Sequence, residues 1–199
     1  MKKAILHLSK DPHLKDIISE VTLGANFRDD PNPYHSLMRA IVFQQLSGKA
    51  AATIHRRFLA LYNGRHPSPK QLLKTEIEAL RSVGLSRQKA TYLQNIAQFW
   101  LNHNLDNHPW DESSDEELIA LLSQIKGVGT WTVQMLLIFT LNRIDVFPID
   151  DLGIQKAIVK KYRLRSTGKR LKERMMQIAQ PWSPYRSIAC RYLWKWLGS

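Results

Sequence analysis

Residues 121–158 read LLSQIKGVGTWTVQMLLIFTLNRIDVFPIDDLGIQKAI, and this segment carries the most structural information in the chain. Apolar residues recur at helical spacing on both sides of KGVGT at 126–130, which predicts two helices joined by a tight turn. Two glycines permit positive φ and keep side chains away from the backbone N–H groups that open the second helix. Those groups, with the helix dipole, favour an anion. Such a turn also serves simply to reverse the chain.

A second signal follows in DVFPIDDL at 145–152, which leads into another helical pattern through Ile154 and Ile158. Asp150 and Asp151 fall where that helix begins, so we place Asp150 at the N-cap and Asp151 in the first turn. Aspartates at such positions commonly do nothing more than cap the helix. A carboxylate held there nevertheless stays ionised beside the helix dipole, as an electrostatic stabiliser must.

The rest of the chain is also helical in pattern. Ser114, followed by Glu117 three residues later, forms a capping box that predicts a helix beginning near Asp115. Proline, glycine and asparagine clusters at 63–69 and 107–109 separate segments of ordinary helix length, and strand-like alternation is scarce. The sequence therefore predicts an all-α fold.

Composition narrows the class of protein. With 199 residues and 44% hydrophobic content, the chain can bury a core as one large domain or two small lobes. A single cysteine, Cys190, excludes an internal disulfide framework, a four-cysteine zinc site and a cysteine-ligated iron–sulfur cluster. No apolar run approaches the roughly 20 residues of a spanning helix, and His7 interrupts the N-terminal apolar stretch. We expect a cytoplasmic, nucleoid-associated protein, nuclear if the source is eukaryotic.

Charge is distributed unevenly along a chain whose net charge is +12. Residues 34–90 and 156–174 each carry a net charge of +8, and residues 91–155 between them carry −7. The two basic segments form a surface for phosphates if they meet in space, and solvated helix faces if they do not. A basic excess of this size favours a polyanionic partner, nucleic acid before a membrane surface.

The order of these motifs resembles the helix–hairpin–helix DNA glycosylases that carry a Gly/Pro-rich loop and an aspartate. Within them it is most similar to the alkylated-base branch typified by bacterial 3-methyladenine DNA glycosylase II. The matching motifs are the hairpin with Trp131-Thr132, Asp145-Val146-Phe147, Asp150-Asp151, Arg39-Ala40-Ile41, Gln44-Gln45-Leu46-Ser47, Pro184-Tyr185-Arg186-Ser187 and Trp194. Only about 33 residues precede the first motif, so the compact form of the family is expected.

The resemblance implies one glycosylase domain over residues 1–199 with two helical lobes and an active site in the cleft between them. One lobe would span about 34–145, and the other would combine 1–33 with 146–199. The implied activity is monofunctional hydrolysis of the N-glycosidic bond of alkylated purines, of the 3-methyladenine and 7-methylguanine type, in base-excision repair. Asp151 is the implied catalytic residue and Asp150 the helix cap.

Five residues are candidates for the substrate pocket, and aromatic rings dominate them: Trp131, Trp194, Tyr185, Met135 and Leu152. A cationic methylated purine gains about 0.5–2 kcal/mol from each favourable contact with an electron-rich ring. Family members that also cut the backbone carry lysine where this chain has Trp131, and tryptophan forms no Schiff base. Met135 and Leu152 depart from the tyrosines of the bacterial enzyme, which leaves the substrate range open.

Eight residues are candidates for contact with DNA: Lys126, Gly127, Val128, Gly129, Thr130, Gln44, Gln45 and Leu46. Excision from a duplex requires that the nucleotide rotate out of the stack and that the vacancy be filled. Gln45 offers an amide for the orphaned base and Leu46 an apolar contact, so either one fits the plug. Gln44 fits equally well as a residue that satisfies nearby backbone.

No metal site formed by side chains is expected, because the seven histidines are scattered and His103 with His108 lacks other ligands. The family implies at most a structural Na⁺ or K⁺ ion at the carbonyls of residues 126–130, and no other cofactor. Double-stranded DNA with damaged bases is the expected partner of a monomer that does not bind membranes. The alternatives are a glycosylase for oxidised, deaminated or mismatched bases, and a non-catalytic helix–hairpin–helix DNA-binding module.

Overall fold

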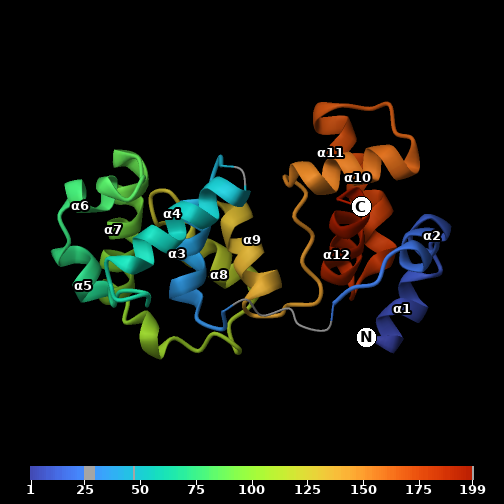
Figure 1. Ribbon diagram of the computed structural model, residues 1–199. Coiled ribbons are helices and arrows are strands. Elements are labelled where there is room, and N and C mark those ends of the chain that lie inside the picture. The colour runs from blue at the N-terminus through green and yellow to red at the C-terminus, as the bar shows by residue number, and fades with distance from the viewer. Residues whose placement is uncertain (25–29, 47, 199) are drawn as a thin grey trace. The chain divides into compact units, whose positions relative to one another are not determined.

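The computed structural model describes residues 1–24, 30–46 and 48–198, and every regular element in these ranges is a helix (Figure 1). The predicted all-α fold is confirmed. The chain divides into two compact units, Met1–Asp29 with Leu137–Ser199, and Asp30–Leu136. The sequence placed this boundary near residue 145, but it falls inside helix α9 (Thr130–Phe139). Phe139, which follows this boundary, packs on Trp194 of the same unit, with ring centroids 5.5 Å apart.

The unit Asp30–Leu136 is built around the long helix α7 (Arg87–Asn102), which contacts three other helices of the unit, α3 (Pro33–Phe43), α5 (Pro69–Lys74) and α6 (Ile77–Ser82) (Figure 1). Its buried residues include Leu37, Ile41, Leu93 and Ile96, each with 0% exposure. This unit also contains α4 (Gly48–Ala60), the 3₁₀ turn η1 (Leu105–Asn107), α8 (Asp115–Leu122) and the part of α9 up to Leu136.

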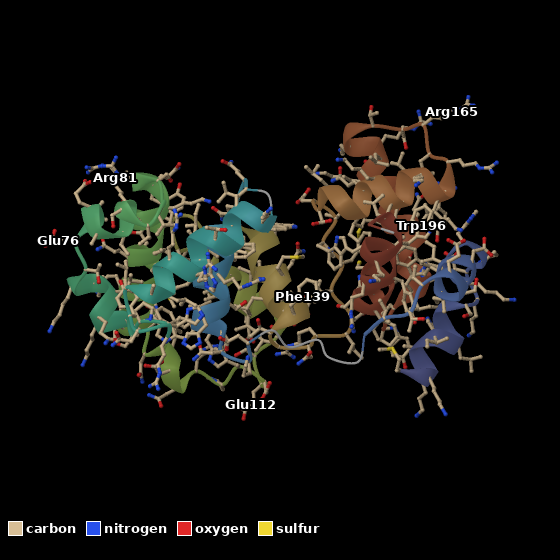
Figure 2. The ribbon with its side chains drawn as sticks, viewed as in Figure 1. Glu76, Arg81, Glu112, Phe139, Arg165 and Trp196 are labelled. Carbon is tan, nitrogen blue, oxygen red and sulfur yellow. The ribbon has the colours of Figure 1, made fainter. Side chains whose placement is uncertain are left out.

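The other unit packs α12 (Arg186–Leu197) against α10 (Leu152–Tyr162) and α2 (Pro12–Glu20) (Figure 1). Its remaining elements are α1 (Lys2–Leu8), α11 (Gly168–Ala179) and the 3₁₀ turn η2 (Gln180–Trp182). Trp182 is 1% exposed in the core, and its indole Nε1 donates to Asp11 Oδ2 at 3.0 Å. Figure 2 shows Arg165 at the outer edge of the connection between α10 and α11.

Local sequence signals explain where the helices begin. Ser114 and Glu117 form the expected capping box, and α8 begins at Asp115 as predicted. Asn32 caps α3, whose first residue is Pro33, a residue that tolerates the first turn because its missing N–H would have had no partner there. Within the described ranges, no helix has the length and hydropathy needed to cross a bilayer.

Candidate active site

Asp151 is the N-cap of α10, because its Oδ1 accepts a hydrogen bond from the backbone N–H of Ile154 at 2.8 Å. The prediction that Asp150 caps this helix is wrong. Asp150 is exposed one residue upstream and forms an ion pair with Lys172 of α11. Asp151 has the extended backbone of an N-cap, with φ of −70° and ψ of 120°, so its carboxylate turns back over the first free N–H groups.

Trp194 of α12 holds the same carboxylate oxygen. Its indole Nε1 donates to Asp151 Oδ1 at 2.8 Å, so two donors converge on one oxygen of a side chain that is only 9% exposed. Gly153 leaves room for this bond. A Cβ atom there would lie 3.0 Å from Asp151 Oδ1 and 3.0 Å from Trp194 Cδ1, closer than side chains normally approach. The carboxylate is therefore fixed in orientation.

Burial raises the pKa of the Cys190 thiol well above its usual value, and the nearby negative charge of Asp151 raises it further. Cys190 is fully buried in α12 and stays protonated at neutral pH. The thiol therefore adds no competing anion beside the carboxylate.

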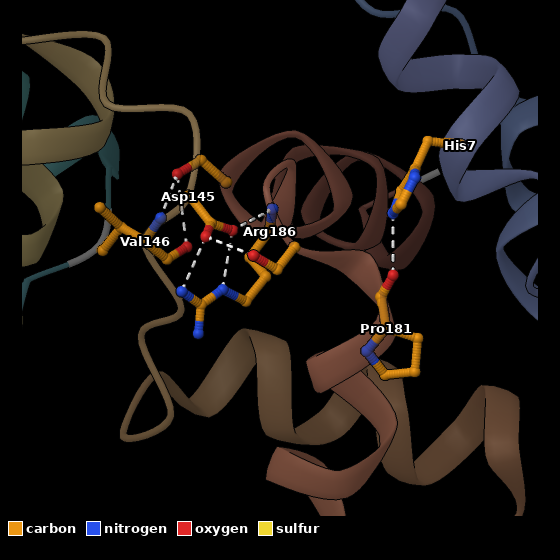
Figure 3. A network of polar contacts seen from close by, with 7 residues as sticks. His7, Asp145, Val146, Pro181 and Arg186 are labelled. Atoms are coloured by element: carbon orange, nitrogen blue, oxygen red, sulfur yellow. Dashed lines mark hydrogen bonds and ion pairs between the residues drawn. The ribbon is translucent and has the colours of Figure 1, made fainter.

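The loop that leads to Asp151 is fixed to α12 through Asp145 (Figure 3). Asp145 Oδ1 accepts from Arg186 Nε at 2.8 Å and from the backbone N–H of Arg186 at 3.1 Å. Its Oδ2 accepts from Arg186 Nη2 at 2.9 Å and from Ser183 Oγ at 2.8 Å. The next residue, Val146, donates its backbone N–H to Ser187 Oγ at 2.8 Å. These bonds connect the Asp145 motif to the Ser187 motif.

The glycine hairpin is shaped by close packing in the unit Asp30–Leu136. Gly127 has φ of +107°, and a Cβ atom there would lie 2.3 Å from the Tyr92 ring, so only glycine fits. Asn95 Nδ2 donates to the carbonyl oxygen of Lys126 at 3.2 Å. Val128 is buried, whereas Lys126, Gly129 and Thr130 are exposed. The hairpin thus exposes Gly129 and the start of α9 to solvent.

The segment after α3 is tied to this hairpin. Gln44 Nε2 donates to the carbonyl oxygen of Gly127 at 3.1 Å, and Lys89 Nζ donates to the carbonyl oxygens of Val42 at 2.8 Å and Gln44 at 2.7 Å. Gln45 has φ of +56° and, like Leu46, is exposed. Of the three candidate plug residues, Gln44 therefore satisfies backbone. Ser47 of the same motif lies outside the described residues.

The candidate pocket residues fall in both units, so the complete pocket stays a prediction. Trp131 and Met135 lie four residues apart on α9 in the unit Asp30–Leu136 and share one helix face. Leu152 begins α10 and is 68% exposed. Tyr185 precedes α12, and its ring forms a T-shaped contact with the His7 ring at a centroid distance of 5.4 Å.

Sequence reasoning missed the structural roles of Gly153 and Lys89, and it assigned Trp194 to stacking alone. An Asp-x-Gly spacing at a helix start was the available signal for Gly153. The bond between Trp194 and Asp151 spans 43 residues and carries no local signature.

The chain has clear relatives among known proteins. It is 37% identical over 203 residues to DNA-3-methyladenine glycosylase 1 of Schizosaccharomyces pombe, covering 98% of this chain and 87% of that protein. The structure of the S. pombe 3-methyladenine DNA glycosylase in complex with abasic DNA is similar with a TM-score of 0.83 and 37% identity, covering 97% of this chain and 95% of that one. A DNA-3-methyladenine glycosidase structure from Bacillus halodurans is similar with a TM-score of 0.82 and 33% identity, covering 97% and 88%.

A family model for base excision DNA repair proteins matches residues 38–184, which contain the hairpin, the Asp145 loop and Asp151. Because this family model matches and because the chain is 37% identical to the S. pombe glycosylase along 98% of its length, the chain belongs to the HhH-GPD superfamily of base excision DNA repair proteins.

Proposed function

We propose that this protein is a DNA glycosylase that excises alkylated purines, of the 3-methyladenine and 7-methylguanine type, from double-stranded DNA. The observation that carries the proposal is the Asp151 carboxylate, fixed at the N-terminus of α10 by Ile154 and Trp194. The names of the relatives support the same substrate class, since the S. pombe relative is a DNA-3-methyladenine glycosylase.

Asp151 has the properties that glycosidic cleavage requires. As the bond to the base breaks, positive charge develops on the sugar, and a pre-oriented anion stabilises that charge more than it stabilises the ground state. Two donors on Oδ1 hold the carboxylate in place before the reaction. The same carboxylate can orient and deprotonate the attacking water.

The leaving group explains why one carboxylate suffices. An alkylated purine already carries positive charge and departs as a neutral base, so no separate acid is needed to protonate it. Trp131 stands at the position where strand-cleaving family members carry lysine, and an indole forms no Schiff base with the sugar. The proposed reaction therefore ends with water addition and an intact strand that carries an abasic site.

DNA binding is assigned to the hairpin of residues 126–130 and the neighbouring residues Gln45 and Leu46. The hairpin's backbone and the start of α9 form a typical phosphate site. A Na⁺ or K⁺ ion at the hairpin would have to share carbonyl oxygens with side-chain donors. The carbonyl oxygens of Lys126 and Gly127 already accept hydrogen bonds from Asn95 and Gln44, respectively. We further propose that the protein acts as a monomer.

A panel of defined lesions tests this function. Duplexes with 3-methyladenine, 7-methylguanine, oxidised, deaminated or mismatched bases are incubated with the protein, then treated with alkali to cut abasic sites. We expect cleavage of the alkylated duplexes only after alkali, and a loss of about 10²–10³ in rate for Asp151→Asn. Asparagine also caps helices, so this variant should keep its fold and its affinity for DNA.

Other outcomes point to the alternatives. Preferred release of oxidised, deaminated or mismatched bases would replace the substrate class and leave the role of Asp151 intact. Strand cleavage without alkali would contradict the monofunctional mechanism. DNA affinity that falls steeply with salt, with every lesion left in place, would indicate a non-catalytic DNA-binding module.

A further inference from the structure

Three potential metal ligands that are spread along the sequence meet in the unit Asp30–Leu136. Asp30 precedes α3, His35 lies in the first turn of α3, and His66 lies between α4 and α5. One ligand atom from each lies within 4.8 Å of the other two. Asp30 Oδ2 is 2.9 Å from His35 Nδ1 and 3.9 Å from His66 Nε2. The sequence predicted no side-chain metal site, because the seven histidines are scattered along the chain and His103 with His108 lacks other ligands.

The imidazole of His66 lacks hydrogen-bond partners among the described residues. Its Nδ1 is buried without a partner, and its Nε2 is too far from Asp30 for a hydrogen bond. The His66 side chain is 14% exposed, which leaves little access to bulk water. Buried polar atoms in native proteins are nearly always satisfied, and an ion or a bound water is the usual explanation when protein partners are missing.

We propose that Asp30, His35 and His66 bind a divalent first-row transition metal ion, Zn²⁺ above all, which clamps the start of this unit to the connection between α4 and α5. Two imidazoles and one carboxylate suit zinc and its neighbours and do not suit Mg²⁺ or Ca²⁺, which prefer oxygen ligands. Water would complete a four-coordinate site. The proposal concerns the stability of this unit and is independent of the proposed glycosylase reaction.

The distances from Asp30 to the two histidines are close to those of a zinc site. Ligand atoms at about 2.0–2.1 Å from a tetrahedral zinc lie about 3.3 Å from one another. The distances from Asp30 Oδ2 to the two imidazole nitrogens, 2.9 Å and 3.9 Å, lie on either side of that value. The ion would replace the contact between His35 Nδ1 and Asp30 Oδ2.

The two imidazole rings must tilt for both to reach one ion. His35 and His66 stack with centroids 4.1 Å apart and an interplanar angle of 12°, so their lone pairs do not yet converge. Burial, together with the nearby His35 and His55, lowers the pKa of His66 to about 4, and Asp30 opposes part of this shift. A metal ion binds the neutral form of an imidazole, and the Asp30 carboxylate would offset part of the charge of the ion.

Metal titration of the full, tag-free chain tests the proposal. After chelator treatment and dialysis, ZnCl₂ is added in a calorimeter and CoCl₂ is followed by visible absorbance, with MgCl₂ as the non-binding probe. We expect one ion per chain and visible Co²⁺ bands that indicate nitrogen and oxygen ligation. The unfolding midpoint should rise by about 5 °C or more at a hundredfold excess over Kd, and EDTA should reverse the shift.

Variants separate this site from adventitious binding. His35→Asn and His66→Asn should each weaken Zn²⁺ binding by more than about tenfold, whereas His103→Asn, an exposed histidine of the same unit, should bind as the wild type does. Asp30→Asn keeps both histidines and serves if the histidine variants fail to fold. Absence of saturable binding, or equal affinity in Asp30→Asn and wild type, overturns the proposal.

Discussion

The indole N–H of Trp194 donates to Asp151 Oδ1 over 2.8 Å, and the backbone N–H of Ile154 donates to the same oxygen over 2.8 Å. One donor belongs to α12 and the other to α10, so the packing of two helices sets the direction of one carboxylate. Trp194 is therefore more than an aromatic wall for a base. It restricts the side-chain rotation that an unanchored aspartate would retain.

Trp194→Phe removes this donor and keeps an aromatic ring. A hydrogen bond to a charged group is worth about 1.5–3 kcal/mol, so we expect kcat for excision to fall roughly 10- to 100-fold. The affinity for abasic DNA should change little, because the hairpin of residues 126–130 is untouched. Single-turnover excision and equilibrium binding to an abasic duplex measure the two effects separately.

Trp196→Phe is the matched control in the same helix. Its indole Nε1 donates to Glu20 Oε2 at 2.8 Å, away from Asp151. This variant should lose a surface hydrogen bond and keep wild-type excision. Equal losses of excision in both variants would show that general disturbance of α12, rather than the bond to Asp151, lowers the rate.

Gly153→Ala adds a methyl group against the same pair. Alanine normally stabilises a helix by up to about 1 kcal/mol relative to glycine, but here the Cβ would lie 3.0 Å from both Asp151 Oδ1 and Trp194 Cδ1. We expect excision to fall at least tenfold, with the unfolding midpoint within a few degrees of the wild type. Gly198→Ala, where the nearest atom would be 3.6 Å away, is the control. Full activity in Gly153→Ala would mean that the carboxylate tolerates reorientation.

The sequence was sufficient for the helical class and for the positions of several helix starts, because these depend on neighbouring residues. The Ser114 capping box and the turn at Gly127 are examples. Choosing between Asp150 and Asp151 as the cap required the backbone, since both are acceptable N-cap residues. The contacts of Gln44 with Gly127 and of Trp194 with Asp151 depend on packing between distant segments, and neither residue type signals such a partner.

The positions of Gln44 and Leu46 predict different defects on substitution. Gln44→Ala removes the bond to the carbonyl oxygen of Gly127 and should lower the free energy of unfolding by about 0.5–1.5 kcal/mol. Leu46 is 40% exposed, so Leu46→Ala should leave stability unchanged. If Leu46 fills the vacancy in the duplex, its loss should slow excision from paired DNA more than from single-stranded DNA.

Urea unfolding and excision from paired and single-stranded substrates measure these effects. Gln45→Ala is the parallel variant, because Gln45 is the other exposed candidate beside Leu46. A paired-DNA defect in Gln45→Ala alone would assign the plug to Gln45. A defect in neither variant would remove this loop from base flipping.

The ion pair between Asp145 and Arg186 predicts a specific dependence of stability on pH. Burial alone would raise the pKa of Asp145, but hydrogen bonds from Arg186 and Ser183 outweigh it and lower the pKa below the usual 3.8. Because the folded pKa lies below the unfolded one, the stabilisation is fully present above about pH 4 and is lost as the pH falls through the folded pKa. Asp145→Asn should therefore lower Tm at pH 6, and the difference from wild type should shrink below pH 4.

Glu173→Gln, an exposed change on α11, should show a small difference at every pH. A gap for Asp145→Asn that stays constant to pH 3 would mean that packing of the loop, and not its charge, stabilises this unit.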